Sequence, residues 1–175
     1  MTHLESYEKK VKLKDIGLCH CQGAKDIKNI VPMLELANRE CLIISDGDAI
    51  AIENQKSHKE AKLWGNWLRY DEIVHGIVTG EDFIDQNFFN KKANSQLEGL
   101  EKFKGNPPFV VQQDNDKLKI LSGFLKVKQI EVAEIKSIIN LLKESLYNGL
   151  TPKVIRQEYK EVFVAVLENY EKTSK

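Results

Sequence analysis

Two carboxylates directly behind a short apolar run are the residues of this chain best suited to chemistry. The run 41–44 is followed by Ser45-Asp46-Gly47-Asp48. If the run is a buried strand, the aspartates must lie where it ends, because their charges cannot be solvated inside a sheet. Residues two apart in an extended segment point to the same side, so both carboxylates can bind one hard cation, and Gly47 would let a phosphate approach. The competing interpretation is an ordinary loop in which Asp48 caps the next helix.

The elements that would position this acid pair are predicted by the alternation of patterns in the first half of the chain. Residues 16–22 and 40–45 are expected to be strands, and the segment opened by Gly23 has apolar residues at helical spacing. Two strands joined through a helix form a parallel crossover, and open parallel sheets bind ligands at the carboxyl ends of their strands. Asp46 and Asp48 follow the second strand at that end.

A third strand is expected over 71–78, and the turn behind it carries two further acids, Glu81 and Asp82. Thr79 or Gly80 can cap a helix there, and the dipole of a helix favours acids in its first turn without any other role. The turn would nevertheless lie on the same edge of the sheet as Asp46. We therefore predict Glu81 or Asp82 as an additional metal ligand.

Aromatic and basic residues gather between the acid pair and the expected third strand. The rings of Trp64, Trp67 and Tyr70 can stack on bases, while neighbouring cations bind phosphates. The candidate nucleic-acid contacts are Lys25, Lys56, His58, Lys59, Lys62 and Arg69. The alternative is that the rings anchor the core beside a solvated helix face, because Trp usually buries most of its ring.

The three cysteines do not form a recognisable metal or disulfide framework. An odd number of cysteines without an export signal argues against structural disulfides. Cys19-His20-Cys21 suggests zinc, but in a strand His20 would face away from the two thiols, and no second ligand pair follows at zinc-site spacing. We expect thiols packed in the core.

Composition narrows the class of protein without specifying its activity. The 175 residues, 42% of them hydrophobic, are enough to bury a core. Lys and Arg (26) balance Asp and Glu (26), which argues against histone-like binding and leaves nucleic-acid contacts to local patches. No stretch approaches the roughly 20 apolar residues of a membrane span, and residues 1–10 are too polar for a signal peptide. These features predict a cytoplasmic protein with no membrane partner.

The sequence changes character after the break at 105–108. We expect a hairpin between 109–111 and 118–121, followed by amphipathic helices over 130–147 and 152–171 whose matching apolar stripes pack together. Such a helix pair is typical of an interaction surface. The predicted organisation is a mostly parallel α/β domain over 12–104 and a helical C-terminal region over 105–175.

One known family shares the order of these motifs. A strand, then a helix opened by Gly23-Ala24-Lys25-Asp26, then the strand that ends in Asp46-Gly47-Asp48, resembles the TOPRIM domain of the overcoming-lysogenization-defect (OLD) nucleases. The version fused to ABC-type ATPases in bacterial phage defence is the most similar, and the resemblance covers roughly 12–85. It implies a TOPRIM-like sheet flanked by helices. It also implies that Asp46 and Asp48 bind Mg²⁺ or Mn²⁺ for phosphodiester cleavage, with Glu81 or Asp82 as the family's further acid.

The sequence also departs from the family. TOPRIM domains begin with a strand that ends in a glutamate, and no residue here corresponds to it; a G-x-x-x-x-G-K-[ST] phosphate loop is missing as well. The resemblance thus implies the C-terminal part of an ATP-dependent endonuclease, incomplete by itself, with DNA as substrate and an ABC-type ATPase domain or subunit as partner.

Two alternatives stay open. The first is a catalytically incomplete TOPRIM-like module that docks a partner ATPase or forms a homodimer through its C-terminal helices. The second is a phosphatase of the haloacid dehalogenase class, in which Thr or Val is typical at the place of Ile50.

Overall fold

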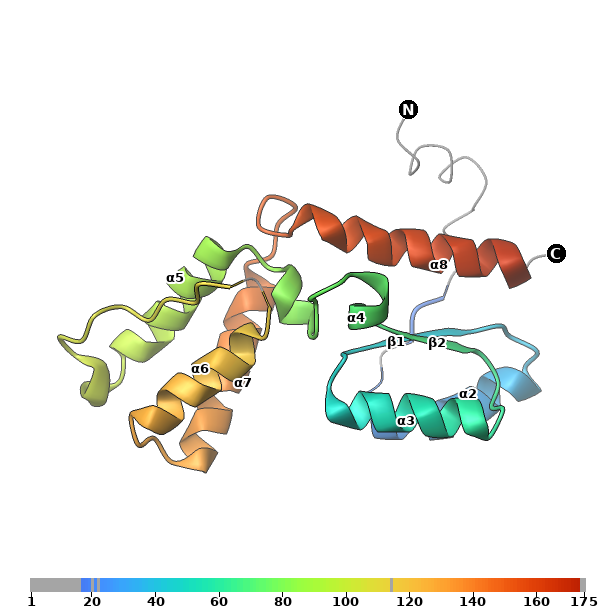
Figure 1. Ribbon diagram of the computed structural model, residues 1–175, viewed down its shortest axis with the longest axis horizontal. Coiled ribbons are helices and arrows are strands. Elements are labelled where there is room, and N and C mark those ends of the chain that lie inside the picture. The colour runs from blue at the N-terminus through green and yellow to red at the C-terminus, as the bar shows by residue number, and fades with distance from the viewer. Residues whose placement is uncertain (1–16, 20, 22, 114, 174–175) are drawn as a thin grey trace. The chain divides into compact units, whose positions relative to one another are not determined.

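The computed structural model describes residues 17–19, 21, 23–113 and 115–173, and it divides into two compact units (Figure 1). One unit combines the residues up to His75 with those from Lys160 onward, and the other comprises Gly76–Tyr159. We call them the sheet unit and the helical unit. The predicted boundary at 104/105 falls inside the helical unit, where helices from both sides of it share one core.

The sheet unit is built around a parallel β–α–β arrangement. Its elements in chain order are α2 (Ala24–Leu36), β1 (Leu42–Ser45), α3 (Ala49–Glu60), β2 (Asn66–Arg69), α4 (Tyr70–Ile73) and α8 (Lys160–Thr173). The strands pair in parallel, with Leu42 beside Asn66 and Ser45 beside Arg69. The mixed α/β class, the helix behind Gly23 and the strand before the acid pair are confirmed, but the sheet of the described residues has two strands and is not a full TOPRIM-like sheet.

The core of the sheet unit lies between α2 and β2. Ile27 and Val31 recur on one face of α2 and pack with Trp67 of β2, and all three side chains are buried. Indole Nε1 of Trp67 donates to Ser45 Oγ at 3.0 Å, so this core side chain also links β2 to the last residue of β1. Burial of such a ring contributes roughly 2–3 kcal/mol to stability.

Two predicted strands of this unit are not observed. Residues 17–19 and 21, the described part of the expected first strand, have no regular structure. The third strand was expected over 71–78, but the observed strand is 66–69 and α4 follows it at once. The chain turns there because the Glu72 carboxylate accepts the backbone N–H of Arg69 at 2.9 Å, as in the first turn of a capped helix.

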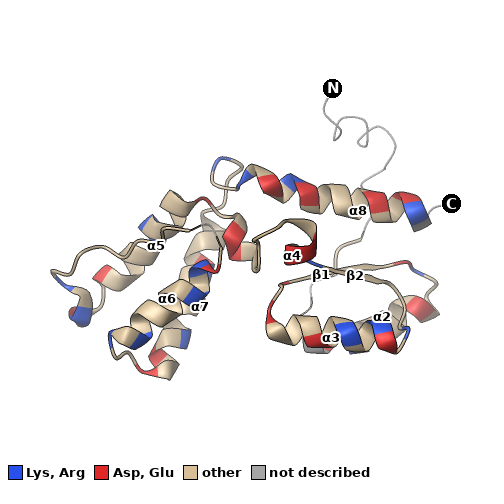
Figure 2. Cartoon of the chain, in the orientation of Figure 1, with Lys and Arg blue, Asp and Glu red and all other residues tan. Residues whose placement is uncertain are grey.

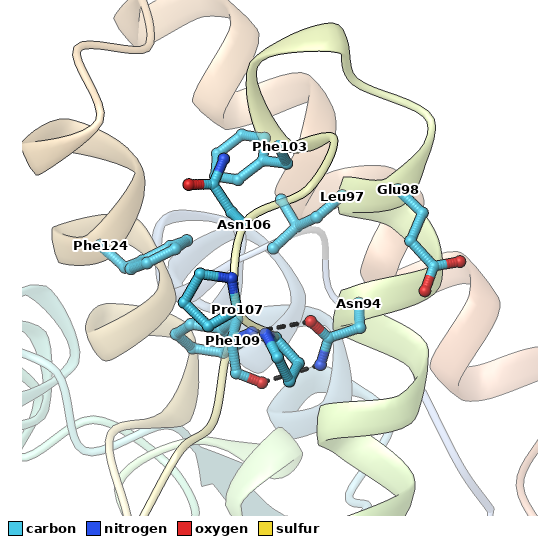
Figure 3. Close-up of a pocket in the computed structure, with 9 residues that line it drawn as sticks. Asn94, Leu97, Glu98, Phe103, Asn106, Pro107, Phe109 and Phe124 are labelled. Atoms are coloured by element: carbon cyan, nitrogen blue, oxygen red, sulfur yellow. Dashed lines mark hydrogen bonds between the residues drawn. The ribbon is translucent and has the colours of Figure 1, made fainter.

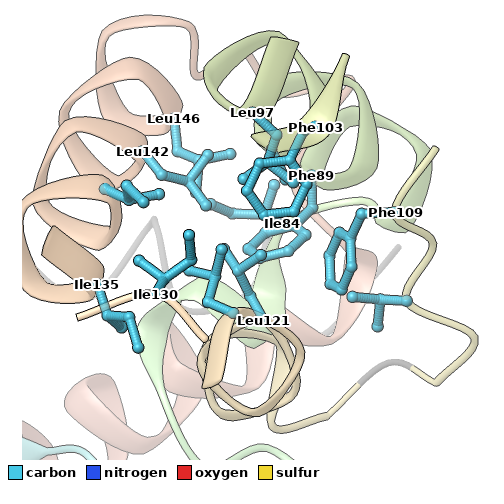
Figure 4. Packing of buried hydrophobic residues seen from close by; sticks show 14 residues of the cluster. Ile84, Phe89, Leu97, Phe103, Phe109, Leu121, Ile130, Ile135, Leu142 and Leu146 are labelled. Atoms are coloured by element: carbon cyan, nitrogen blue, oxygen red, sulfur yellow. The ribbon is translucent and has the colours of Figure 1, made fainter. Parts of the chain in front are cut away.

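The helical unit packs three helices around a single apolar cluster. Its elements are η2 (Gly80–Phe83), α5 (Gln86–Glu98), η3 (Glu101–Phe103), α6 (Lys117–Val127), α7 (Val132–Asn148) and η4 (Gln157–Tyr159). Figure 4 shows the cluster, in which Phe89, Leu121 and Leu142 are fully buried and come from α5, α6 and α7 respectively. The η2 turn with Thr79 as its N-cap agrees with the predicted cap.

The predicted hairpin of the helical unit is wrong. Phe109–Val111 is extended, but its expected partner forms α6, since its apolar residues recur at helical spacing and Leu121 and Leu125 face the core. The extended segment is instead hydrogen-bonded by side chains of α5.

The two C-terminal helices have different packing partners from those predicted. The expected helix over 130–147 is confirmed as α7, which packs against α5 and α6. The helix expected over 152–171 begins only at Lys160, belongs to the sheet unit and contacts α4. Its start is late because Ile155 forms an antiparallel bridge with Ile84, which extends the backbone there. None of the helices described is long and apolar enough to cross a bilayer.

Candidate functional site at the carboxyl edge of the parallel strands

Asp46 and Asp48 follow β1 at the carboxyl edge of the parallel pair, as predicted for a ligand site in a parallel sheet. Asp46 is partly buried, and its backbone carbonyl accepts a hydrogen bond from Ser45 Oγ at 3.0 Å. Asp48 is exposed and is the N-cap of α3, where Oδ1 accepts the backbone N–H of Ala51 at 2.7 Å. One carboxylate therefore has the helix-capping role that the sequence left as the alternative, and it keeps a second oxygen for other contacts.

A third carboxylate, that of Asp71, reaches the same loop. A Cβ atom added at Gly47 would lie 2.3 Å from Asp71 Oδ1 and 2.8 Å from its Cγ. The space that glycine leaves is thus filled by Asp71, whereas the sequence suggested that a phosphate would use it. Sequence reasoning missed this residue because it placed Asp71 inside a strand. The available signal was that Asp71-Glu72 comes shortly after the apolar pair Trp67-Leu68, as Asp46-Gly47-Asp48 comes after the apolar run 41–44.

Arg69, the last residue of β2, binds both acids that follow it. Its Nε and Nη2 atoms donate to the two carboxylate oxygens of Asp71 at 2.9 and 3.0 Å, which is a bidentate pair. Its Nη1 lies 3.2 Å from Glu72 Oε1 and also donates to the side-chain amide oxygen, Oε1, of Gln55. The acidic residues of α4, next to the ends of the strands in Figure 2, are therefore fixed in place by a guanidinium.

Glu72 is held in its charged form by these contacts. Burial alone would raise its pKa, but hydrogen bonds from the Arg69 backbone and the Gln55 side chain, together with the charges of Arg69 and Lys59, outweigh burial. The pKa of Glu72 therefore lies below its usual value. Gln55 is itself buried and joins α3 to β2, because its amide also donates to the Trp67 carbonyl at 2.8 Å.

The other predicted metal ligands, Glu81 and Asp82, belong to the helical unit and are buried, at 2% and 0% exposure. Asp82 accepts backbone N–H groups from Val78, Thr79 and Lys117 at 3.0–3.1 Å. Glu81 accepts the Tyr147 hydroxyl at 3.0 Å and pairs with Lys143 at 2.9 Å. Both carboxylates have partners inside their own unit.

The predicted nucleic-acid contacts have different surroundings within the described residues. Two of the lysines face acids, with Lys56 3.8 Å from Glu60 and Lys59 3.7 Å from Glu72. His58 is buried and lies edge-on to Trp67, with ring centroids 5.4 Å apart. Arg69 is engaged as above, Lys62 is exposed, and the side chain of Lys25 lies outside the described part of the chain.

Two of the three thiols and both indoles take part in packing, whereas the prediction of a packed thiol is wrong for Cys19. Cys21 and Cys41 contact the cluster around Trp67, and burial raises the pKa of both thiols; Cys19 is exposed, and His20 lies outside the described residues. Trp64 Nε1 donates to the Arg39 carbonyl at 2.9 Å.

The donor set at the edge suits one hard cation whose other ligands are water. In the described part of the chain, no group of three or more His, Cys, Asp or Glu side chains is placed to hold a metal ion. Mg²⁺ keeps several waters and is commonly bound through only one or two carboxylates, so Asp46 and Asp48 are sufficient in number for it.

Comparison of the chain with protein-family models, with curated proteins and with solved structures found no match.

Proposed function

We propose that this chain is the TOPRIM-like, metal-dependent module of a nuclease that acts on phosphodiester bonds of DNA. In this proposal Asp46 and Asp48 bind one Mg²⁺ or Mn²⁺ ion weakly, and the module is incomplete without further acidic residues. The observation that carries it is the position of Asp46 and Asp48, behind β1 at the carboxyl edge of a parallel β–α–β unit. Ligands of open parallel sheets bind at this edge.

The chemistry that a divalent cation supplies here is stabilisation of negative charge on a phosphodiester and activation of water. The residues of this chain would hold and orient such a cation. The N–H of Ala51 fixes one oxygen of Asp48, and Asp46 directly follows β1. Efficient phosphodiester cleavage commonly uses two ions about 4 Å apart, which requires more carboxylates than these two.

The resemblance to the OLD nucleases supplies the remaining parts of the proposal. It suggests that the missing glutamate and the ATPase belong to another segment or subunit, with an ABC-type ATPase as the partner. Asp71 places a third carboxylate beside the proposed metal site, because it lies against Gly47, and Arg69 balances its charge.

The first test is a titration of the full chain with Mn²⁺, followed by electron paramagnetic resonance of the free ion. We expect weak binding by the wild type and a loss of at least tenfold in affinity for Asp46→Asn and Asp48→Asn. Asparagine can still cap α3, so the second variant removes the charge and keeps the cap. Glu53→Gln, an exposed change on α3, is the control. Equal affinity of all four proteins would overturn the metal site.

The second test is nicking of supercoiled DNA by the purified chain in Mg²⁺ or Mn²⁺. We expect slow nicking that Asp46→Ala abolishes. Metal binding without any nicking, even when the ATPase partner is supplied, would contradict a nuclease and leave only a cation site.

One observation favours the alternative, a catalytically incomplete module that docks a partner ATPase. Arg69 binds both Asp71 and Glu72, so a fixed guanidinium already balances two of the acids near the edge. A binding module would fail to bind Mn²⁺ but form a complex with the ATPase, or a homodimer, in light scattering. Mn²⁺ binding that requires Asp46, together with nicking that Asp46→Ala abolishes, excludes this alternative.

A further inference from the structure

A row of polar side chains on α5 binds the backbone of an extended segment in the helical unit. Asn90 and Asn94 lie four residues apart on one face of the helix. Asn94 accepts the N–H of Phe109 and donates to its carbonyl, both at 2.8 Å (Figure 3). Asn90 does the same for Val111 at 2.9 and 3.3 Å. Alternate residues of an extended chain face the same way, so the row matches the segment.

Glu98 occupies the next position of this row, at the last residue of α5. Before Phe109 the segment contains Pro108 and Pro107, and the same alternation would place Pro107 opposite Glu98. Proline has no backbone N–H to donate. Within the described residues Glu98 makes no hydrogen bond or ion pair, and its side chain is exposed. The row therefore ends in a carboxylate that lacks a donor.

A cavity of about 320 Å³ opens beside Glu98 and is lined mainly by apolar side chains. Three of them are the rings of Phe103, Phe109 and Phe124, and the centroid of Phe124 lies 5.8 Å from that of Phe103 and 5.0 Å from that of Phe109. Figure 3 shows these rings grouped beside Pro107, with Glu98 at the end of α5. The cavity thus combines aromatic walls with a carboxylate at one side.

Two features of the cavity attract positive charge, and two nearby lysines do not supply it. The C-terminal end of a helix carries partial negative charge, and the last turn of α5 contains no basic residue to balance it or Glu98. Aromatic faces attract cations, as the chain itself illustrates where Lys128 Nζ lies 5.8 Å from the ring centroid of Phe124. Two nearby lysines have other partners, because Lys102 donates to the Gln129 carbonyl and Lys104 pairs with Glu101.

We propose that this cavity binds the side chain of a lysine or arginine from a partner peptide. The aliphatic stem packs against the phenylalanine rings, and the charged head lies at Glu98 and the end of α5. The site is independent of the metal site proposed for the sheet unit, since every residue that lines it belongs to the helical unit.

The test is a titration of the full-length chain with three capped pentapeptides that differ only in the central residue, Arg, norleucine or Glu, flanked by glycines. Binding is followed by the NMR shifts of the Asn94 and Asn106 side-chain amides, both of which line the cavity. We expect the Arg peptide to shift these signals saturably and at least fivefold more tightly than norleucine, with no shift from the Glu peptide. Equal affinity for Arg and norleucine would overturn the proposal, because the cavity would then select only apolar volume.

Two variants test separately how the charge of Glu98 and the ring of Phe124 contribute to peptide affinity. Glu98→Gln should weaken the Arg peptide about two- to fivefold and leave norleucine unchanged, as expected for a partly exposed charge pair. Glu134→Gln, an exposed change on α7, should leave both affinities unchanged. Phe124→Leu keeps an apolar side chain but removes a ring, and should weaken the Arg peptide about twofold. An unchanged Arg affinity in Glu98→Gln would also overturn the proposal.

Discussion

The two acid pairs of this chain look alike in the sequence and have opposite surroundings in the structure. Asp46 and Asp48 lie in a loop behind a strand, and Asp48 is exposed. Glu81 and Asp82 lie in a 3₁₀ turn and are at most 2% exposed. A buried carboxylate is tolerated only with hydrogen bonds and opposite charge, which the helical unit supplies. The comparison shows that an acid pair can stabilise a fold or remain accessible to a ligand, depending on what packs against it.

The largest effect that this comparison predicts is at Asp82. Asp82→Ala leaves one buried and two partly buried N–H groups without this acceptor, and we expect a loss of about 3–5 kcal/mol in the free energy of unfolding. Urea unfolding followed by circular dichroism measures it. Asp48→Ala, which removes an exposed cap, should cost about 1 kcal/mol. Similar losses of stability for both variants would contradict the distinction between a buried and an accessible acid pair.

The second prediction concerns Lys117, whose ammonium is fully buried and donates to the carbonyls of Asp82 and Ile84 at 2.9 and 2.5 Å. Lys117→Met keeps the stem and leaves these carbonyls without that donor, so we expect a loss of about 2–3 kcal/mol. Lys119→Met, on the same helix with its side chain 83% exposed, is the matched control and should change stability by less than about 0.5 kcal/mol. If Lys117→Met matches its control, the Lys117 ammonium does not stabilise the turn that carries the buried acids.

The third prediction tests whether Asp71 packs against Gly47, between the accessible acids Asp46 and Asp48. In Gly47→Ala the new Cβ meets Asp71, and we expect a loss of about 1–2 kcal/mol together with weaker Mn²⁺ binding as Asp71 moves away. Gly123→Ala, where a Cβ has open space in α6, should be neutral or slightly stabilising. A neutral Gly47→Ala would show that Asp71 does not pack against the loop in solution.

The smallest effect is a pH dependence at Glu72. Because its pKa is lowered on folding, its contribution to stability is present above the usual pKa of a glutamate and is lost as the pH falls through the lowered value. Unfolding at neutral pH and at about pH 3 should show a smaller acid-induced loss for Glu72→Gln than for the wild type. Glu53→Gln should behave as the wild type does. An identical acid response in Glu72→Gln would mean that Arg69 and Gln55 do not stabilise the charged form.

Local patterns predicted those elements whose burial follows from their own periodicity. The apolar spacing in α2 and α7 predicted both helices, and the apolar run before Asp46 predicted β1. The cap at Asp48 was also available from the sequence, as one of two interpretations. These features depend on residues within a turn or two of each other, which a sequence displays directly.

Tertiary contacts decided the rest. Residues 71–78 have the apolar content of a strand, but the contacts of Arg69 with Asp71, Glu72 and Gln55 end β2 and begin α4. The bridge between Ile84 and Ile155 delays α8 to Lys160.

What the sequence determined by itself is therefore where carboxylates follow apolar residues, since charge and hydropathy pattern are local properties of the chain. Only the tertiary structure decided which of those carboxylates are buried, because burial depends on partners distant in sequence. Asp82 is bound by Lys117, 35 residues away, and Asp71 lies against Gly47 across the two strands. The free energy of a charge depends on what surrounds it, and those surroundings form only when the distant segments pack together.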